Sequence, residues 1–547
     1  MKNNYIFSVI IPARNEMFLK NTIDDLIKNK EAETEVIAVL DGAWVDPPIE
    51  QHPDVNIIYV NKSIGQRAAT NLGVRLSRSK YVAKLDAHCS FDKGFDRKMI
   101  EAIEKVGEKT TILPVMRNLW AFDWECLDCK WTIYQDKAPK KCDACGGNKL
   151  HMKMLWIGKH NPQSTSYCFD AEPKFRYFED WKHRPQYAKD KKEKGLTETM
   201  SIQGSCFMLE RKRYQELNIC DETLGSWGNQ GIEVALKTRL AGGRVLVNHN
   251  TWYAHLFRTK AEFGFPWPVS GRSQKQTKEN VKDLFWNCKW DKQIYPVSKV
   301  VEQFWPVKGW VDDDLRQLKL NEIKTKRSGL YKIKSLSNGR IYIGSAVNIA
   351  NRIFEHMKDL KQKNHCNTHL QNTWDKYGEG DLEFSVLYFC KAEDLLVNEQ
   401  HFIDEYKEKI GWDNMFNISP TAGSSLGREC SEETKEKISQ AQMGKEAWNK
   451  GLTKETDDRV NIYAQKLVGR NPFEGKEHPK GMLGKAHSEE TKELIGLAQR
   501  GIPKSEEHNR KNSEAHKGKI FTEEHRENLR QAQKELNRGR NEKGQYF

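Results

Sequence analysis

Four cysteines occur as two closely spaced pairs in the first third of the chain. Cys126, Cys129, Cys142 and Cys145 form the pattern Cys-X2-Cys, twelve residues, Cys-X2-Cys, within CLDCKW and CDACGG. Two such pairs at this separation suit a tetrahedral site in which four thiolates bind Zn²⁺, and the following glycines allow a tight turn. Because four sulfur ligands leave no open position, we expect a structural zinc-ribbon insertion over residues 124–148. A redox-active Cys-X2-Cys pair is the alternative.

An aspartate and a histidine stand two residues apart where an apolar run ends. The run VAKLDAHC contains Asp86-Ala87-His88, and the earlier run IAVLDG ends in Asp41-Gly42. In an extended segment the side chains of Asp86 and His88 point to the same side, so both can bind one divalent cation. Such a cation would neutralise the leaving charge when a sugar–phosphate bond of a diphosphate breaks. An Asp-X-His triplet by itself is common and is weak evidence for a metal site.

A third group of polar residues lies in the second half of the chain. Arg352 and His356 are four apart in NIANRIFEHM and therefore share one face of a predicted helix. Glu399 falls within the apolar stripe of AEDLLVNEQHFIDEYKEK, where a carboxylate is costly unless a cation or a donor meets it. Tyr331 and Tyr342 stand on neighbouring strand-like runs. Each could be an ordinary satisfied polar group, but their convergence favours a site able to hydrolyse a phosphodiester.

The elements that position Asp41 and Asp86 lie within residues 1–320. The β-branched runs FSVIIPA, TEVIAVL, VNIIYV and YVAKLDA have amphipathic stretches such as MFLKNTIDDLIKNK and GQRAATNLGVRLSRS between some of them. This order is typical of a largely parallel α/β sheet. Ligands of such sheets bind at the carboxyl ends of the strands, which is where the two aspartates fall.

A second unit follows after a charged segment. LRQLKLNEIKTKR is expected to be a tether, with a linker at residues 321–327. Residues 328–420 then form a compact α+β unit that begins with the hairpin GLYKIKSLSNGRIYIGSA. The Asn338-Gly339 pair in the middle of this hairpin suits a tight turn that needs positive φ.

The last region, residues 427–547, consists of one unit repeated imperfectly. The copies are CSEETKEKISQAQMGK, HSEETKELIGLAQRGIPK, SEEHNRKNSEAHKGK and FTEEHRENLRQAQ. At or near its start, each copy has Ser or Thr followed by Glu-Glu. This pattern caps a helix and places negative charge in its first turn. The first three copies close on Gly-Lys or a similar ending. Four such starts favour a tail of helical repeats over a solvated charged tail.

Composition narrows the classes of partner. The chain of 547 residues carries a formal net charge of +13, which favours an anionic partner such as nucleic acid or a nucleotide. The run YIFSVII is too short to span a bilayer and no other run reaches that length, so we expect no membrane partner. The 12 cysteines fit a cytoplasmic protein, in a host cell if the source is a phage, as thiols or metal ligands.

The front region resembles the GT-A glycosyltransferases of family 2 and related families. SVIIPARNE, VLDG and SIGQRAATNLGVRLSRSKYVAKLDAHC resemble their nucleotide-sugar half. The Asp-Ala-His form, MSIQGSCFMLERKRYQELN and GSWGNQGIEVALKTRLAGGRVLVNHNTWYAHLFR are similar to the polypeptide N-acetylgalactosaminyltransferases. The resemblance implies a Rossmann-like GT-A fold, a nucleotide-sugar donor, a glycan or protein acceptor, and Mn²⁺ or Mg²⁺. The implied residues are Asp86, His88 and His255 for the cation, Asp41, Arg67 and Asp86 for the nucleotide sugar, and Glu233 for catalysis.

Residues 328–420 resemble the GIY-YIG nucleases, whose name motifs appear here as GLY and YIG. The tail repeats resemble the modular DNA-binding repeats of homing endonucleases. The resemblance implies cleavage of double-stranded DNA, with Mg²⁺ held by Glu399, a phosphate steadied by Arg352, and water activated by Tyr331 or Tyr342. The implied catalytic residues are Tyr331, Tyr342, Arg352, His356, His365, Glu399 and Asn417.

Two enzyme-like regions with no common chemistry therefore share one chain. The simplest explanation for the shared chain is a bifunctional enzyme in which both activities are useful. We favour the hypothesis that an intron-encoded homing endonuclease frame has been joined to a host transferase gene, of phage type, with the seam near Lys324 to Ser328. Either both activities persist, or only the endonuclease is active and the transferase half is an exon-derived relic.

Overall fold

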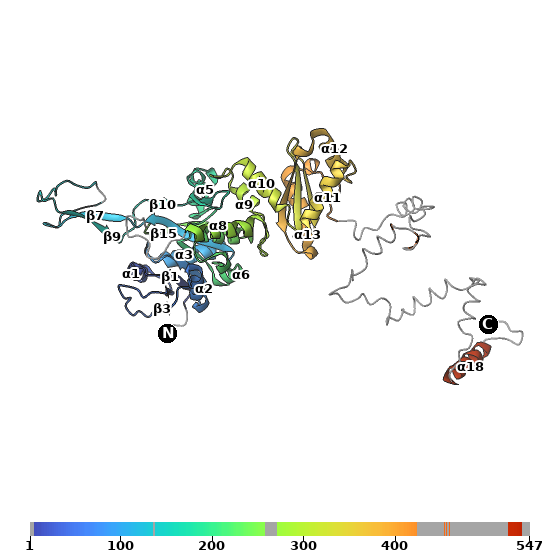
Figure 1. The fold of residues 1–547 in the computed structure, drawn as a ribbon, viewed down its shortest axis with the longest axis horizontal. Helices are drawn as coiled ribbons and strands as arrows, with labels where there is room; N and C mark the ends of the chain where they lie inside the picture. Colours follow the sequence, from blue (N-terminus) through green and yellow to red (C-terminus); the bar gives the residue numbers. More distant parts are fainter. Residues whose placement is uncertain are drawn as a thin grey trace. The chain divides into compact units, whose positions relative to one another are not determined.

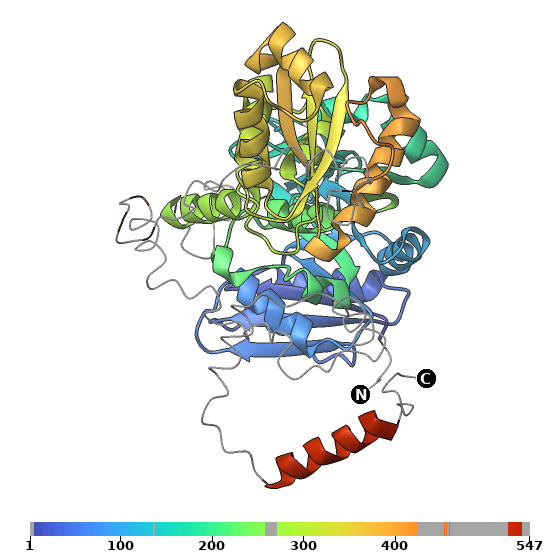
Figure 2. The ribbon, with the colours of Figure 1, turned by 90° about the vertical axis from the view of Figure 1, so that its right-hand side faces the viewer.

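The computed structural model describes residues 5–134, 137–257, 271–423 and 523–538, together with residues 453, 456 and 459. The chain divides into two compact units, residues 1–429 and 430–547. Figures 1 and 2 show the ribbon from two directions. The first unit contains both regions for which the sequence predicts chemistry.

Four parallel strands begin the large sheet, and they correspond to the four predicted runs. Their order is β4-β1-β2-β3, and every neighbouring pair is parallel. Strands β1 and β2 are buried along almost their whole length, because the sheet is covered on its faces. The strands are β1 (Phe7–Ala13), β2 (Thr34–Asp41), β3 (Val55–Val60) and β4 (Tyr81–Leu85), with helices α1 (Leu19–Asn29) and α2 (Gln66–Leu76) between them.

The sheet continues beyond β4 with strands of mixed direction. Strand β14 (Cys206–Glu210) is antiparallel to β4 and to β6 (Thr110–Asn118), whereas β15 (Arg244–His255) runs parallel to β6. The short strand β5 (Cys89–Phe91) pairs with β15 so that Cys89 lies opposite His255. This register carries the end of β15 to the Asp-Ala-His turn that follows β4, although the two segments are far apart in the sequence.

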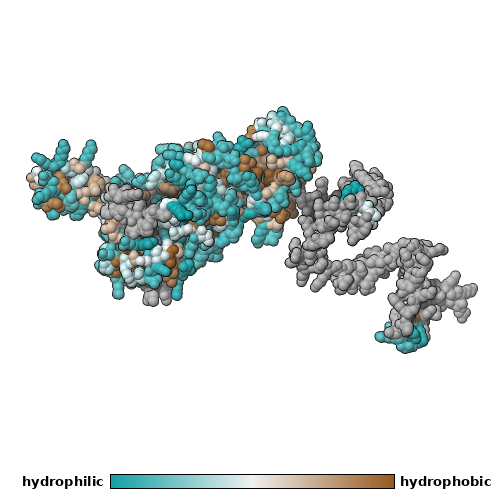
Figure 3. All heavy atoms as spheres, viewed as in Figure 1, coloured by the Kyte–Doolittle hydropathy of each residue, from teal (hydrophilic) through white to brown (hydrophobic). Residues whose placement is uncertain are grey.

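The remaining elements of this region surround the sheet. Their bounds are α3 (Phe95–Val106), β10 (Pro162–Ser164), β11 (Tyr167–Phe169), β12 (Phe175–Tyr177), α4 (Glu179–Lys182), α5 (Pro185–Lys194), β13 (Leu196–Glu198), α6 (Arg211–Glu216), η1 (Glu222–Leu224), α7 (Gln230–Leu240), α8 (Gly271–Trp286) and α9 (Val297–Phe304). The visible surface of the described residues is mostly hydrophilic with scattered apolar areas (Figure 3).

The four cysteines belong to a small separate sheet, visible in Figure 1 at the label β7. It has the order β8-β7-β9, with both pairs antiparallel. Its strands are β7 (Ala121–Cys126), β8 (Thr132–Tyr134) and β9 (Leu150–Leu155). Cys126 ends β7 and Cys129 lies in the turn that follows it, whereas Cys142 and Cys145 lie in the loop before β9.

The segment expected to be a tether is partly helical. Helix α10 spans Asp312–Glu322 and includes the first residues of the charged run. Leu318 is buried in the core of the large sheet, whereas Ile323 is buried in a core of the next domain. The two apolar side chains find partners in different domains, and for this reason the segment is ordered rather than a free tether. Residues between Ile323 and Ser328 complete the connection.

The next domain contains three antiparallel strands in the order β17-β16-β18. Gly339 has φ 73° in the hairpin turn, as the Asn-Gly pair predicts. Side chains alternate between the two faces: Tyr331 and Ile333 join one core, and Leu330 and Ile343 join the other. Figure 2 shows the strands between α11 and α13. The elements are β16 (Gly329–Ser335), β17 (Ile341–Ala346), α11 (Ile349–Lys361), α12 (Thr368–Tyr377), η2 (Glu379–Asp381), β18 (Leu382–Phe389), η3 (Ala392–Asp394), α13 (Leu395–Ile410) and η4 (Trp412–Asn414).

Strand β18 is an edge strand of this small sheet, and α10 lies against it. The Lys319 ammonium bonds the carboxylate of Glu383 on β18 at 3.0 Å. The guanidinium of Arg327 donates to backbone carbonyls between residues 288 and 293, the shortest bond being 2.7 Å. Chain that precedes the domain therefore packs against the edge strand β18 through α10 and Lys319.

Most of the repeat tail lies outside the described residues. Helix α18 (Glu523–Arg538) belongs to the fourth repeat and begins directly after Thr522, with Glu523 and Glu524 in its first turn, as predicted. In the parts of the chain described here, no helix combines the length and the apolar character needed to cross a bilayer.

Candidate active sites

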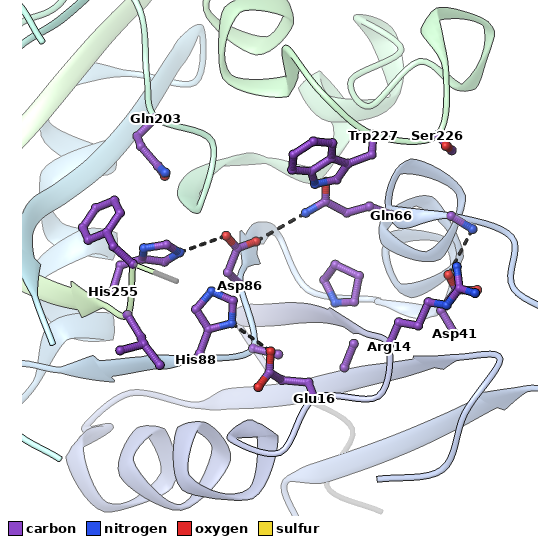
Figure 4. A pocket seen from close by; sticks show the side chains of 16 residues that line it. Arg14, Glu16, Asp41, Gln66, Asp86, His88, Gln203, Ser226, Trp227 and His255 are labelled. Carbon is purple, nitrogen blue, oxygen red and sulfur yellow. Dashed lines mark hydrogen bonds and ion pairs between the residues drawn. The ribbon is translucent and has the colours of Figure 1, made fainter. Parts of the chain in front are cut away.

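A cavity of about 340 Å³ lies at the carboxyl ends of the parallel strands. Asp41, Asp86, His88 and His255 line it, so the structure brings together four residues that the sequence singled out. Figure 4 shows Trp227 lying across the cavity from His88. The position agrees with the rule that open α/β sheets bind ligands at this edge.

Three of these residues form a candidate metal centre. One ligand atom each of Asp86, His88 and His255 lies within 4.8 Å of the others. Nδ1 of His88 is 3.1 Å from a carboxylate oxygen of Glu16, which orients the ring and leaves Nε2 toward the cavity. Burial lowers the pKa of His255 to about 4, so its imidazole is neutral, the form that binds metals. The donor set therefore fits a divalent cation.

A lysine that the sequence reading missed adjoins this centre. The buried Lys84 ammonium pairs with a carboxylate oxygen of Asp86 and donates to the Gly204 carbonyl oxygen at 2.9 Å. Burial opposes ionisation of Asp86, but Lys84 and the two histidines hold the pKa of this carboxyl well below its usual range. The signal was available in VAKLDAHC, because Lys84 is two residues before Asp86 and so points to the same side of the strand.

Arg67 and Glu233 lie behind the cavity rather than in its lining. Both side chains are fully buried, and Arg67 Nη2 is 2.9 Å from a Glu233 carboxylate oxygen. Arg67 also donates to the Gly228 carbonyl oxygen at 2.9 Å. The pair thereby holds the loop that carries Ser226 and Trp227 to the cavity wall.

Asp41 shapes the loop before α2. One carboxylate oxygen accepts from the Ile64 backbone N–H at 2.6 Å, and the other accepts from the Gly65 N–H at 3.0 Å and the Ser63 hydroxyl at 2.8 Å. Gly65 has φ 88°, which a side chain would strain. Asp41 thus fixes the backbone that leads Gln66 into the cavity.

The four cysteines converge within the small sheet. Their sulfur atoms all lie within 4.8 Å, with Cys126 and Cys145 3.7 Å apart and Cys129 and Cys142 3.5 Å apart. The backbone N–H of Cys129 contributes most to lowering the pKa of the Cys126 thiol to about 7. Four convergent thiols with an easily ionised member fit a zinc ion.

In the second domain, three rings form a bonded row on the α11 face of the sheet. The Tyr331 hydroxyl oxygen is 2.7 Å from His356 Nε2, and His356 Nδ1 is 2.7 Å from His365 Nε2. Burial raises the pKa of Tyr331 well above its usual value, with Arg352 acting in the opposite direction. Burial also lowers the pKa of His356 to about 3, so this imidazole is neutral. Tyr342 packs against both Tyr331 and His356.

Glu399 and Asn417 lie along β17. A Glu399 carboxylate oxygen accepts from the Ser345 hydroxyl at 2.6 Å, and burial raises the pKa of this half-buried carboxyl. The Asn417 side chain accepts from the Ile343 N–H at 2.9 Å and donates to the Ile343 carbonyl oxygen at 2.8 Å. The Asn417 side chain therefore bonds the backbone of β17 as a neighbouring strand would, and this holds β17 in place.

Gly344 lies between these groups. A methyl group added at its Cα would come within 2.5 Å of the Tyr331 hydroxyl oxygen and 2.7 Å of the Tyr342 ring. The glycine of the YIG motif is thus required by space, because the tyrosine of one strand crosses the backbone of the next.

Family models match three stretches of the chain. Glycosyl transferase family 2 matches residues 8–125, and the GIY-YIG catalytic domain matches residues 327–411. The NUMOD3 motif matches residues 427–457, 471–496 and 484–502. The matched stretches contain the Asp-Ala-His turn, the bonded row of rings, the first predicted repeat and most of the second, whereas the third and fourth predicted repeats lie outside them.

Curated relatives fall into the same two classes. Probable N-acetylgalactosaminyltransferase 6 of Caenorhabditis elegans is 22% identical over 304 residues, which are 53% of this chain and 44% of that protein. Intron-associated endonuclease 1 of Enterobacteria phage T4 is 36% identical over 107 residues, which are 19% of this chain and 41% of that protein. The chain spans less than half the length of each of these relatives.

Two solved structures are similar to parts of the chain. A crystal structure of GalNAc-T7 with UDP, GalNAc and Mn2+ is 16% identical with a TM-score of 0.39, covering 62% of this chain and 65% of that chain. The catalytic domain of the homing endonuclease I-TevI is 32% identical with a TM-score of 0.16, covering 17% of this chain and 99% of that chain.

The matches confirm both resemblances inferred from the sequence. The large sheet is GT-A-like and the small one belongs to the GIY-YIG domain, and both are domains of enzymes. The homologues are N-acetylgalactosaminyltransferases and homing endonucleases. The chain therefore joins a glycosyltransferase family 2 domain to a GIY-YIG domain with NUMOD3 motifs.

Proposed function

We propose that the protein is a fusion of phage type with two activities. Residues 328–420 cleave DNA phosphodiesters with Mg²⁺, and residues 1–320 transfer a sugar from a nucleotide sugar to a glycan or protein acceptor. Convergence of residues from distant elements supports this proposal most directly: His255 meets Asp86 and His88, as His356 meets Tyr331. The free thiols of the described cysteines agree with action in the reducing cytoplasm of a host cell.

In the proposed nuclease, Glu399 holds Mg²⁺, which would supply positive charge to the scissile phosphate. Arg352, whose guanidinium is half-buried beside Tyr331, steadies the same phosphate. A tyrosine helps to activate water. Asn417 keeps β17, the strand that carries Tyr342, in place.

In the proposed transferase, Asp86, His88 and His255 hold Mn²⁺ or Mg²⁺, which would neutralise the diphosphate leaving group. Asp41 lies near the nucleoside. Arg67 and Glu233 act from behind the cavity by holding the loop that bears Trp227, which faces the sugar or the acceptor.

The four cysteines hold one structural Zn²⁺ per chain. Elemental analysis of protein purified in metal-free buffer is expected to give one zinc per chain. The variant Cys129→Ser replaces an exposed thiol of the cluster and should lose the metal. The control variant Cys390→Ser changes a cysteine directly after β18, outside the cluster, and should keep the metal. Zinc-free wild type with four freely titratable thiols would contradict the assignment.

The repeat tail, residues 427–547, supplies recognition of double-stranded DNA. Counted over residues 431–547 it has 24 Lys plus Arg and 20 Asp plus Glu, a net charge of only 24 − 20 = +4, so bulk attraction is insufficient. We propose that basic groups between the short helices contact phosphates. Binding to a target duplex over a salt series should weaken and lose slope in a chain ending at Leu426; unchanged affinity and slope would contradict a recognition role.

A second candidate is that only the endonuclease is active and the transferase half is an exon-derived relic. The pairing of Lys84 with Asp86 favours it, because an ammonium already balances the proposed cation ligand. Purified full-length protein should be assayed for Mn²⁺-dependent hydrolysis of a panel of nucleotide sugars and for Mg²⁺-dependent cleavage of DNA. Cleavage without sugar-nucleotide hydrolysis supports the relic, hydrolysis with cleavage supports the fusion of two active enzymes, and absence of both contradicts the proposal.

A further inference from the structure

The large sheet ends in an edge strand that lacks the usual protection against pairing. Strand β3, labelled in Figure 1, is last in the sheet order, and in the described part of the chain it pairs with β2 alone. Its residues, VNIIYV, include no charge and no proline, and its register against β2 runs without a bulge. Soluble proteins commonly use such features to keep edge strands from pairing with other chains. The edge of β3 is therefore open to a further strand.

Two bonds at the ends of β3 determine which of its backbone groups face outward. The carbonyl oxygens of Asp54 and Val60 accept from N–H groups at the two ends of β2, at 2.8 and 2.9 Å. Because backbone groups alternate along a paired strand, the even-numbered residues of β3 face β2. The backbone groups of Ile57 and Tyr59 therefore face outward, and no described residue bonds them. The Val55 carbonyl also faces outward, whereas its N–H already donates to a loop carbonyl at 3.0 Å.

An exposed aromatic pair stands at the carboxyl end of β3. The ring of Trp44, in the loop after β2, stacks on the ring of Tyr59 with centroids 4.2 Å apart and planes at 6°. Trp44 is 66% exposed and Tyr59 is 39% exposed. Because the stacked rings already restrain each other, little side-chain freedom is lost when a partner covers them. The pair is thus suited to contact with another surface.

A hollow of about 490 Å³ lies beside the other half of the same strand. Val55 and Ile57 of β3 line it together with residues 49–53 of the preceding loop. Side chains two residues apart on a strand point to the same face, so Val55, Ile57 and Tyr59 share one face of the sheet. The hollow and the aromatic pair therefore lie on the same face of β3, one on each side of Ile57.

We propose that β3 pairs antiparallel with β3 of a second copy of this chain, about a two-fold axis at Ile57. This register sets Ile57 opposite Ile57 of the second copy, and Tyr59 opposite Val55. The two Ile57 residues exchange a pair of N–H···O bonds, and each Tyr59 N–H donates to the Val55 carbonyl oxygen of the other copy. The same axis brings Trp44 of each copy to the hollow beside Val55 of the other. The surface is therefore complementary to itself, and the interface depends on neither of the two proposed activities.

Charges at the two ends of β3 favour the antiparallel direction. Glu50 precedes the strand and is 85% exposed, although it approaches Lys20 at 3.4 Å, and the exposed Lys62 follows the strand. Antiparallel pairing about Ile57 sets Lys62 of one copy opposite His52 of the other and near its Glu50, so opposite charges meet at both ends. Parallel pairing would bring like charges together. The antiparallel pair also closes the exposed edge, so a third copy cannot add to it.

A charge exchange at Ile57 tests the axis. Sedimentation of the full-length wild type without DNA, at about 1 to 50 µM, should show an equilibrium between one and two copies. Ile57→Lys and Ile57→Glu each set two like charges opposite one another, so each variant alone should sediment as a single copy. An equimolar mixture of the two variants should associate again, because one Lys then faces one Glu. A misfolded strand would not be rescued by mixing.

Two further variants test the rest of the surface. Leu76→Lys is the matched control, because it adds the same charge at a 49% exposed apolar position on α2 and should leave association unchanged. Trp44→Ala should weaken association by about tenfold or more, as loss of a central tryptophan does. Wild type that remains a single copy at every concentration overturns the proposal. So does Ile57→Lys that associates like wild type, or a mixture that stays apart. Unchanged association of Trp44→Ala would overturn the fit of this ring into the hollow.

Discussion

The two candidate sites hold their polar groups in different ways. In the transferase region, Asp86, His88 and His255 meet at the strand ends beside a cavity, and the charged partners Lys84 and Glu16 contact them directly. In the nuclease region the row of rings is joined by hydrogen bonds, and the carboxylate of Glu399 accepts from the Ser345 hydroxyl.

The difference teaches that the polar groups of a sheet can be arranged in two ways. Charged groups suit the binding of a cation, and hydrogen-bonded neutral groups suit the transfer of a proton. The transferase arrangement balances charge with charge, and the register of β5 on β15 sets the distances. The nuclease arrangement instead joins the buried rings of Tyr331, His356 and His365 by hydrogen bonds. Removing a charge should therefore act on metal affinity in the first site and on proton transfer or metal-dependent cleavage in the second.

The largest expected effect is that of Glu399→Ala on cleavage. Loss of the proposed Mg²⁺ ligand should reduce Mg²⁺-dependent cleavage by about a thousandfold or more, while duplex binding stays the same because the tail is untouched. Glu408→Ala, a change on the same helix at an exposed position, is the matched control. Cleavage by Glu399→Ala at the wild-type rate would contradict the proposal that Glu399 binds Mg²⁺.

In the transferase region, Asp86→Asn should weaken Mn²⁺ binding by about a hundredfold, because one of three ligands loses its charge. Titration of Mn²⁺ into the protein measures this whether or not the half is catalytically active. Asp92→Asn is the control, since Asp92 pairs with Lys98 outside the metal set. Equal Mn²⁺ affinity in Asp86→Asn and wild type would show that the cation binds elsewhere.

The variant Lys84→Met should change the Mn²⁺ affinity in the opposite direction. Removal of a buried positive charge beside Asp86 should tighten Mn²⁺ binding by about tenfold, because like charges repel strongly where water is excluded. Met has a similar length and no charge. If affinity instead falls, Lys84 organises the carboxylate for the metal rather than competing with it.

The smallest expected effect is on stability. Gly344→Ala places a methyl group against Tyr331 and should lower the free energy of unfolding by about 1–3 kcal/mol, as overpacking does. Gly380→Ala is the control, because nothing lies within 4 Å of the added atom. Denaturant midpoints of the two variants measure the difference, and equal midpoints would mean that the crossing of strand and tyrosine relaxes freely.

Local patterns were sufficient to predict several elements. The four β-branched runs became β1 to β4, and the Asn338-Gly339 turn has the expected backbone. These features depend on neighbouring residues alone. The cysteine spacing also predicted a cluster that the structure contains.

Features that depend on distant partners could not be predicted in the same way. Arg67 was expected at the nucleotide sugar, but its partner Glu233 is 166 residues away and draws it into the interior. The charged run before residue 328 contains Leu318 and Ile323, which become ordered only because two separate cores receive them. A sequence pattern records the polarity of a side chain but not which domain it meets.

The packing of α10 against β18 has a consequence for where the second domain begins. Lys319 and Arg327 precede the domain, yet Lys319 bonds Glu383 on the edge strand, and Arg327 bonds the Gln293 carbonyl oxygen. A domain excised at Ser328 would lose the packing of α10 against the edge strand β18, which would leave this edge more accessible to strands of other copies. The stretch of chain that packs as this domain therefore begins upstream of the GLY motif.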